Sequence, residues 1–280
     1  DMRQRIVAEL DESRSARTRL TEQAQVLDEQ TVELRRSNAE LEQFAYVASH
    51  DLQEPLRKVA SFCQLLERRY GDQLDERGTE YIRFAVDGAK RMQVLINDLL
   101  TFSRVGRLNV THAEVELDRV LDLAIENVSG AIEESGARID RPHGALPRVL
   151  GDATLLTMLW QNLIGNAVKF SHPGEPPRID IEFEPSDDPA APDQWRFSVS
   201  DNGIGIGDEF VDKVFVIFQR LHGRDAYAGT GIGLALCKKI VEYHGGTIWI
   251  DTSYAGGTRF YFTLPVHAVV PQMEEEGTRV

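Results

Sequence analysis

The stretch A-S-H-D-L-Q-E-P-L, residues 48–56, places a histidine and an aspartate side by side in a helical pattern. An exposed imidazole is largely uncharged at neutral pH and is therefore nucleophilic. Asp51 can accept a hydrogen bond from one ring nitrogen of His50, which leaves the other nitrogen free to attack. Pro55 lacks an N–H group and clashes with the carbonyl of Asp51, so we expect a loosened helix below this pair. Taken alone, the stretch is more typical of an incidental surface histidine on a kinked helix.

A second group of reactive side chains lies in L-L-T-M-L-W-Q-N-L-I-G-N-A-V-K-F-S, residues 155–171. At ~100° per helical residue, Asn162, Asn166 and Lys169 fall within one narrow stripe, while the leucines face another side. Two amides and an ammonium beside a buried face suit phosphate oxygens and a hydrated Mg²⁺. As an isolated pattern, a solvated polar face explains the stripe more often.

Three glycine-containing stretches follow. In S-D-N-G-I-G-I-G, residues 200–207, Asp201 leaves a strand pattern beside Gly203 and Gly205. The glycines allow the backbone to approach a planar ligand, and the carboxylate can accept a hydrogen bond from an exocyclic amine. In Y-A-G-G-T-R-F-Y-F, a glycine pair and Thr258 lead into the last strand pattern. Each of these stretches alone is common in ordinary turns.

The third stretch, G-T-G-I-G-L-A-L-C-K-K-I at residues 229–240, is a glycine-rich loop that runs into a helix. Its backbone N–H groups and the helix N-terminus favour a polyphosphate. The residues concerned are Gly229, Thr230, Gly231 and Gly233. The spacing differs from that of the P-loop and of the dinucleotide-binding fingerprint.

The composition limits the kind of protein that carries these groups. The chain has 280 residues, a net charge of −14 and a pI near 5.0, which argues against a nucleic-acid partner. Its two cysteines, Cys63 and Cys237, lie in apolar helical patterns and favour a reducing, cytoplasmic location without zinc. No apolar run is long enough to span a membrane. Because the chain opens with Asp1 inside a helical pattern, we expect a fragment of a longer protein.

The elements that position these groups fall into separate segments. Leucines recur at heptad spacing over residues 1–43 and predict a parallel coiled coil with a weak second seam; they are Leu20, Leu27, Leu34 and Leu41. Residues 44–105 predict a helical hairpin that is too narrow to bury its two apolar stripes, so it should pair with a second copy as a four-helix bundle. After a linker at 106–113, alternating strand patterns and helices near 118–135, 153–170 and 233–244 predict an α/β sandwich over 114–265. Residues 266–280 read as a solvated tail.

In order and separation, these stretches resemble the sensor histidine kinases of two-component signalling. F-A-Y-V-A-S-H-D-L-Q-E-P-L looks like the H box, N-L-I-G-N-A-V-K-F the N box, D-N-G-I-G-I the first glycine box, V-F-V-I-F-Q-R-L the phenylalanine box and G-T-G-I-G-L the second glycine box. The likeness covers residues 44–265 and is greatest to kinases placed after PAS or phytochrome-type sensors. The ordered set is specific although each box alone is not.

The resemblance implies a dimeric kinase core with an ATP-binding domain of the gyrase, chaperone and histidine-kinase type. It implies that His50 accepts the phosphoryl group with Asp51 as its acidic partner, and that an aspartate of a receiver domain is the next acceptor. Asn166 would bind Mg²⁺ on the ATP phosphates, and Asp201 would recognise adenine. The remaining nucleotide-site residues that it implies are Asn162, Lys169, Gly203, Gly205, Phe218, Arg220, Gly229, Thr230, Gly231, Gly233 and Thr258. Within this set, Arg220 would assist the γ-phosphate, and Phe218 together with Phe215 would anchor the glycine-rich loop over the phosphates.

Two other functions stay open at this point. A gyrase- or chaperone-like ATPase is disfavoured because Asn162 stands where those enzymes use a glutamate to activate water. A pseudokinase that relays conformation without transfer is also compatible with the pattern. Glu54 stands where many relatives with phosphatase activity have Thr or Asn, so that activity is in doubt. The stimulus, the receiver partner and the choice between phosphorylation within or between subunits are not encoded in these patterns.

Overall fold

The computed structural model describes residues 2, 23, 25–26, 30–33, 36, 47, 51–106, 113–187, 193–221, 227 and 229–266. The chain divides into two compact units, Asp1–Glu54 and Pro55–Val280, and each is considered by itself. All described residues of the first unit are helical. The leucines of the predicted coiled coil, the predicted tail beyond residue 266 and His50 lie outside the described residues. The coiled coil therefore stays a prediction.

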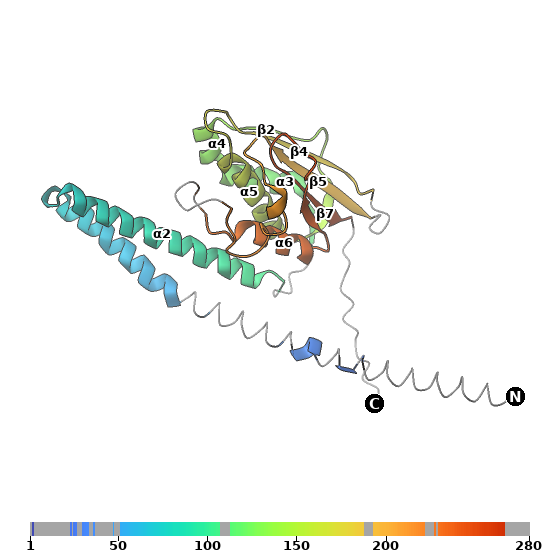
Figure 1. The fold of residues 1–280 in the computed structure, drawn as a ribbon, viewed down its shortest axis with the longest axis horizontal. Coiled ribbons are helices and arrows are strands. Elements are labelled where there is room, and N and C mark those ends of the chain that lie inside the picture. Colours follow the sequence, from blue (N-terminus) through green and yellow to red (C-terminus); the bar gives the residue numbers. More distant parts are fainter. Residues whose placement is uncertain are drawn as a thin grey trace. The chain divides into compact units, whose positions relative to one another are not determined.

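The second unit begins with a helical hairpin. Residues 55–70 are helical, a 3₁₀ turn η1 (Gly71–Gln73) follows, and α2 (Glu76–Arg104) runs back beside the first helix (Figure 1). Asp75 caps α2, because its side chain accepts a hydrogen bond from the N–H of Gly78 at 2.7 Å. The predicted polar turn is therefore shorter than expected, since α2 already begins at Glu76.

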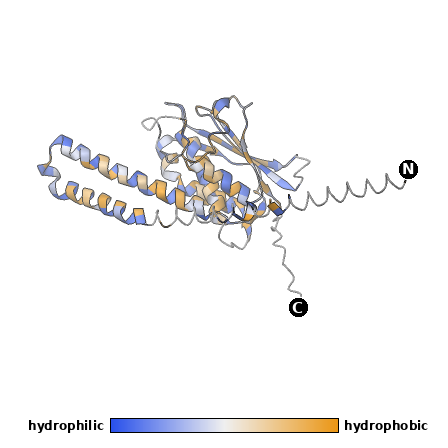
Figure 2. Cartoon of the chain, turned by 60° about the horizontal axis from the view of Figure 1, so that its bottom comes forward, coloured by the Kyte–Doolittle hydropathy of each residue, from blue (hydrophilic) through white to orange (hydrophobic). Residues whose placement is uncertain are grey.

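One hairpin covers only part of its own apolar surface. Ala60, Val86 and Ala89 are buried between or beside the helices. In contrast, Phe62 and Phe84 are 64% and 58% exposed, and hydrophobic residues recur along both helices (Figure 2). The hairpin thus leaves a wide apolar stripe open to solvent.

The rest of the unit is built on a five-stranded sheet with the order β2-β4-β5-β7-β6. These strands are β2 (Arg138–Asp140), β4 (Arg178–Pro185), β5 (Gln194–Asp201), β7 (Arg259–Pro265) and β6 (Ile248–Ile250). β2 pairs parallel with β4, and the other neighbours are antiparallel. A separate two-stranded sheet joins β1 (Ala113–Glu116) to β3 (Arg148–Gly151).

Helices cover one face of this sheet and complete an α/β sandwich (Figure 1). They are α3 (Leu117–Asn127), α4 (Ser129–Ser135), α5 (Ala153–Lys169) and α6 (Gly233–Tyr243). A short 3₁₀ turn η2 (Asp208–Phe210) lies between β5 and α6. The predicted fold class, helical hairpin followed by α/β sandwich, is confirmed for this unit.

The core of the sandwich is aromatic. Trp160 of α5 makes T-shaped contacts with Phe197 and Phe262, with ring centroids 6.0 and 5.2 Å apart, and these two phenylalanines stack at 5.0 Å. All three side chains are fully buried. Close packing of this kind fixes α5 against β5 and β7 and thereby fixes the residues at their ends.

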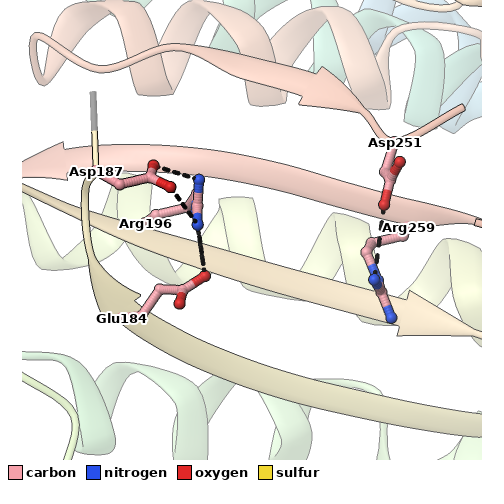
Figure 3. A network of polar contacts seen from close by, with 5 residues as sticks. All are labelled: Glu184, Asp187, Arg196, Asp251 and Arg259. Atoms are coloured by element: carbon pink, nitrogen blue, oxygen red, sulfur yellow. Dashed lines mark hydrogen bonds and ion pairs between the residues drawn. The ribbon is translucent and has the colours of Figure 1, made fainter. Parts of the chain in front are cut away.

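The outer face of the sheet is polar and closed by ion pairs. Arg196 of β5 bonds Glu184 at 2.8 Å and Asp187 at 2.6 Å, while Arg259 of β7 lies 3.6 Å from Asp251 (Figure 3). Arg259 also donates to the hydroxyl of Ser200 at 2.8 Å. These long side chains cover the strands, which explains the alternation of apolar and polar residues seen in the sequence.

Two features of the sandwich differ from the sequence-based expectations. The strands β2 and β3 were not expected from the alternation of polar and apolar residues. The helix expected near 118–135 is two helices, since α3 ends at Asn127 and α4 begins at Ser129, beside the weak helix former Gly130. Across the part of the chain that the structure describes, no helix is both long and apolar enough to cross a bilayer.

Candidate nucleotide-binding site

A cavity of about 440 Å³ lies beside α5, at the end of β5 and before α6. Most of the nucleotide-site residues implied by the sequence line it, namely Asn162, Asn166, Lys169, Asp201, Gly205, Arg220, Gly229, Thr230, Gly231, Gly233 and Thr258. Gly203, Phe215 and Phe218 do not line it. Its size and its mixture of apolar and polar walls are typical of a small-molecule site.

The helix α5 presents the polar stripe. Its N-cap Asp152 accepts hydrogen bonds from the N–H groups of Thr154 and Leu155 at 2.7 and 3.1 Å. One side of α5 is buried in the core, which turns Asn162, Asn166 and Lys169 toward the cavity. The packing of the apolar side of α5 therefore determines the direction in which its polar stripe faces.

Asn162 also fixes the start of α6. Its side-chain N–H donates to the carbonyl of Met158 at 2.8 Å, so its side-chain oxygen points away from that carbonyl. A Cβ at Gly233 would lie 2.7 Å from this oxygen, so the amide of Asn162 would have to move away. Glycine at the first position of α6 thus lets the helix N-terminus approach α5 across the cavity.

Asp201 is a buried carboxylate, and only one of its two oxygens accepts hydrogen bonds from the described residues. It is 7% exposed, and its Oδ1 accepts hydrogen bonds from the N–H groups of Gly203 and Thr258 at 2.8 and 2.9 Å. Burial raises the pKa of Asp201, and the two backbone hydrogen bonds oppose that rise. Its Oδ2 receives no hydrogen bond from the described residues, so the cavity contains an acceptor that is suited to an amine.

The turns around Asp201 require glycine. A Cβ at Gly203 would overlap the carbonyl oxygen of Phe170, and a Cβ at Gly257 would overlap the carbonyl oxygen of Asp201. Gly257 also has φ of +147°, a conformation that favours glycine. Gly203 therefore shapes the site from behind, by close backbone approach, although it does not line the cavity.

Two cations face the cavity without a carboxylate partner among the described residues. Lys169 lies with its Nζ 4.2 Å from the ring centroid of Phe170. Burial, followed by the nearby Arg220, lowers the pKa of Lys169. Uncompensated positive charge in a partly buried cavity favours an anionic ligand.

Arg220 braces the loop before α6. Its guanidinium donates to the carbonyls of Gly229 at 2.9 Å and Tyr227 at 2.6 Å. In this structure two of its donors hold the loop, and its implied contact with the γ-phosphate stays a prediction. The charge still lies in the cavity wall.

The two phenylalanines expected to anchor the loop behave differently. Phe215 packs partly buried against the core, with its ring 6.4 Å from that of Phe260. Phe218 is 57% exposed, has φ of 65°, and its N–H donates to the carbonyl of Gly231 at 2.9 Å. Phe218 thus contributes through its backbone, in a left-handed conformation that costs about 1 kcal/mol for a bulky residue.

The cavity has walls that the sequence-based interpretation did not include. Tyr227 packs on Phe170 with ring centroids 4.8 Å apart, and both line the cavity. Ile204 and Ile206 supply an aliphatic wall, a role that their alternation with glycine could have indicated. Asp98 of α2 also lines the cavity, and nothing in its sequence surroundings pointed to this.

His50 lies outside the described residues, so its side chain is not part of this geometry. Asp51, in the first unit, is helical and exposed. No group of three or more His, Cys, Asp or Glu side chains in the described part of the chain could hold a metal ion. A divalent ion here would therefore depend on a ligand's own oxygens together with amide oxygens such as that of Asn166.

An α/β sandwich with a cavity between a polar helical stripe and a glycine loop defines an ATP-binding domain of the kinase and gyrase class. Residues 151–268 match the family model described as histidine kinase-, DNA gyrase B- and HSP90-like ATPase. Residues 40–107 match the model of the His Kinase A (phospho-acceptor) domain. The chain therefore belongs to the histidine kinases and comprises the catalytic core of a sensor histidine kinase.

Two curated relatives are similar to most of this chain. Cyanobacterial phytochrome A of Nostoc sp. is 51% identical over 87% of this chain and 31% of its own length. Phytochrome-like protein Cph1 of Synechocystis sp. is 46% identical over 87% of this chain and 32% of its own. The chain thus spans about a third of the length of these curated relatives.

Among solved structures, full-length ShkA in complex with AMPPNP matches with a TM-score of 0.62 and 26% identity. The match covers 80% of this chain and 45% of that one. It supports the arrangement of helical hairpin and sandwich described above.

Proposed function

We propose that this core binds MgATP in the cavity, transfers the γ-phosphoryl group to His50, and passes it on to an aspartate of a receiver domain. The observation that carries the proposal is the combination, in one cavity, of a buried acceptor on Asp201 and uncompensated cations on Lys169 and Arg220. An adenine nucleotide needs both an acceptor for its amine and positive charge for its phosphates.

Adenine recognition falls to the end of β5. The unused Oδ2 of Asp201 accepts a hydrogen bond from the exocyclic amine, while Ile204 and Ile206 contact the ring. Asp201 is buried, so water competes poorly with the amine for this oxygen. A neutral amide at this position would present a donor or an acceptor with altered geometry and lose part of the discrimination.

Phosphate binding falls to α5 and the loop before α6. Lys169 supplies a full charge, and the backbone of Gly229, Gly231 and the α6 N-terminus supplies N–H donors. Asn166 would hold Mg²⁺ with Asn162 nearby, and the ion would supply positive charge that neutralises the phosphates. Asn162 cannot act as the base that activates water, which favours transfer over hydrolysis.

The transfer step needs little covalent work from the protein. A ring nitrogen of His50 forms the bond to the γ-phosphorus while the bond from phosphorus to the bridging oxygen breaks and ADP leaves. Asp51 accepts the hydrogen bond of the other ring nitrogen and so keeps the attacking lone pair in place. The phosphohistidine then serves as the donor to the receiver aspartate.

The hairpin points to a homodimer. Its exposed apolar stripe includes Phe62, Leu66, Phe84 and Met92, each between 48% and 64% exposed. Pairing two hairpins buries both stripes as a four-helix bundle. An upstream sensor, as the length of the phytochrome relatives indicates, would regulate this bundle. The cytoplasmic location stays a prediction, and Glu54 still argues against phosphatase activity.

The function is tested with γ-labelled ATP and Mg²⁺. We expect acid-labile, base-stable label on the protein, its loss in His50→Gln, and its transfer to a receiver domain. The His50→Gln variant should still bind ATP, because the cavity is intact. Label that persists in His50→Gln would reject the acceptor; free phosphate without label would favour the gyrase-like ATPase, and absent nucleotide binding the pseudokinase.

A further inference from the structure

The helix α2 contacts the loop before α6 through a side chain that the proposed chemistry does not use. The Oγ1 of Thr230 donates a hydrogen bond to the Oδ2 of Asp98 at 2.6 Å. A second contact lies close by, where the Nζ of Lys239 in α6 donates to the carbonyl of Phe102 at 2.8 Å. The same Nζ lies 4.4 Å from the centroid of the Phe102 ring.

The first contact lies on the cationic side of the cavity. Gly229, which precedes Thr230, accepts a hydrogen bond from Arg220 at 2.9 Å. A Cβ at Gly229 would lie 2.9 Å from the Nζ of Lys169. Thr230 therefore stands next to the groups that are suited to hold phosphates.

Asp98 is an uncompensated anion at this place. It lines the cavity, and no described cation pairs with it. Burial raises the pKa of Asp98, and the hydrogen bond from Thr230 opposes that rise. A carboxylate in a partly dehydrated wall repels a polyphosphate that enters beside it.

We propose that the bond between Asp98 and Thr230 is a nucleotide-sensitive latch, which holds the loop against α2 until the triphosphate of ATP displaces it. This inference rests on the proposed function of the cavity. The hydroxyl of Thr230 has a single hydrogen to donate, so it cannot bond Asp98 and a phosphate oxygen at once. Closure of the latch and binding of the phosphates through Thr230 are therefore mutually exclusive.

The latch makes Asp98 a positioning residue that opposes ATP. When the latch opens, the hydroxyl of Thr230 donates to a phosphate oxygen in place of the carboxylate of Asp98. Opening also removes the repulsion between this carboxylate and the phosphates. Opening the latch also weakens the attachment of the loop to α2. Of the two contacts described above, only the hydrogen bond from Lys239 to the carbonyl of Phe102 then remains. ATP binding thereby frees the sandwich from the resting contact with α2 before transfer.

The test measures the affinity of the full chain for MgATP and for adenosine by calorimetry. In Asp98→Ala we expect MgATP to bind about tenfold more tightly, with the affinity for adenosine unchanged, because adenosine lacks phosphates. Asp98→Asn should show a smaller gain, since it loses the charge but keeps an acceptor for Thr230. Glu80→Ala, which removes an exposed carboxylate of the same helix, is the control and should change neither affinity.

A second readout separates the latch from general loosening. Hydrogen exchange in residues 98–104 of α2 should rise when MgATP is added to the wild type, and should already be raised in Asp98→Ala. Unchanged MgATP affinity in Asp98→Ala, or an equal change for adenosine, would overturn the latch while the proposed function stands. If no variant binds ATP, the proposed function fails and the latch with it.

Discussion

The hairpin and the sandwich solve the burial of apolar surface in opposite ways. In the sandwich, Trp160, Phe197 and Phe262 are fully buried within one chain. In the hairpin, Phe62 and Phe84 are more than half exposed. The sandwich therefore completes its core within one chain, whereas the hairpin leaves an apolar stripe that we expect a second copy to cover. This difference separates the module that binds nucleotide from the module that is suited to respond to it.

The largest expected effect removes the centre of the sandwich core. Phe197→Ala deletes a fully buried ring stacked on Phe262 at 5.0 Å and should lower the free energy of unfolding by about 3–5 kcal/mol. Phe62→Ala is the matched control in the hairpin, and should change the unfolding of the sandwich little. Denaturant titration followed by aromatic fluorescence measures both. Equal losses in the two variants would mean that the modules do not differ in self-sufficiency.

The backbone of the site gives the next effect. Gly203→Ala forces a Cβ onto the carbonyl oxygen of Phe170, which should cost about 1–3 kcal/mol and displace the N–H that holds Asp201. ATP affinity should fall at least tenfold as a result. Gly71→Ala in the hairpin turn meets nothing within 4 Å and should leave both stability and affinity unchanged. The measurement is a titration of the folded Gly203→Ala variant with ATP. A normal affinity would contradict the role of Gly203 in positioning Asp201.

How much of this was visible in the sequence also differs between the two regions. The stripe Asn162, Asn166 and Lys169 could be placed from helical period alone, because one buried side of α5 fixes the other. The role of Gly203 behind the cavity could not, since it depends on the distant carbonyl of Phe170. A local sequence pattern shows which face of a helix is polar. It does not show which distant segment of backbone packs against a turn.

Asp98 illustrates the same limit from the hairpin side. The helical period of α2 predicts its apolar stripe but is silent about a carboxylate that meets Thr230, a residue far along the chain. The sequence is likewise silent about the hydrogen bonds that Arg220 donates to the carbonyls of Gly229 and Tyr227. Contacts between distant segments depend on tertiary packing, and that is where the sequence-based interpretation stopped.

The open stripe of the hairpin provides a third prediction. Phe84→Lys places a charge where two hairpins are expected to meet, so the dimer dissociation constant should rise at least tenfold, with the burial of one aromatic ring worth about 1.5–3 kcal/mol. Sedimentation across a concentration series measures it. Leu123→Lys on α3 of the sandwich, where Leu123 is 48% exposed, is the control and should leave the dimer intact. Dissociation by both variants, or by neither, would remove the hairpin as the dimer interface.

The smallest expected effect concerns pH. Burial raises the pKa of Asp201 above its ordinary value of 3.8, so the folded state holds this proton more tightly than the unfolded state does. The contribution to stability is complete below the unfolded pKa and is lost as pH rises through the raised folded pKa. Asp201→Asn removes the titrating group and should flatten this part of the profile of unfolding free energy against pH.

The comparison is cleanest when Asp98, whose pKa burial also raises, is neutralised in both proteins by Asp98→Asn. Glu80→Gln in the hairpin, an exposed carboxylate, serves as the control and should leave the slope unchanged. A slope that Glu80→Gln alters as much as Asp201→Asn does would place the proton uptake on the surface rather than in the nucleotide cavity. A slope that only Asp201→Asn removes would mean that the sandwich keeps an acceptor for adenine dehydrated, at a cost in stability that the exposed hairpin does not share.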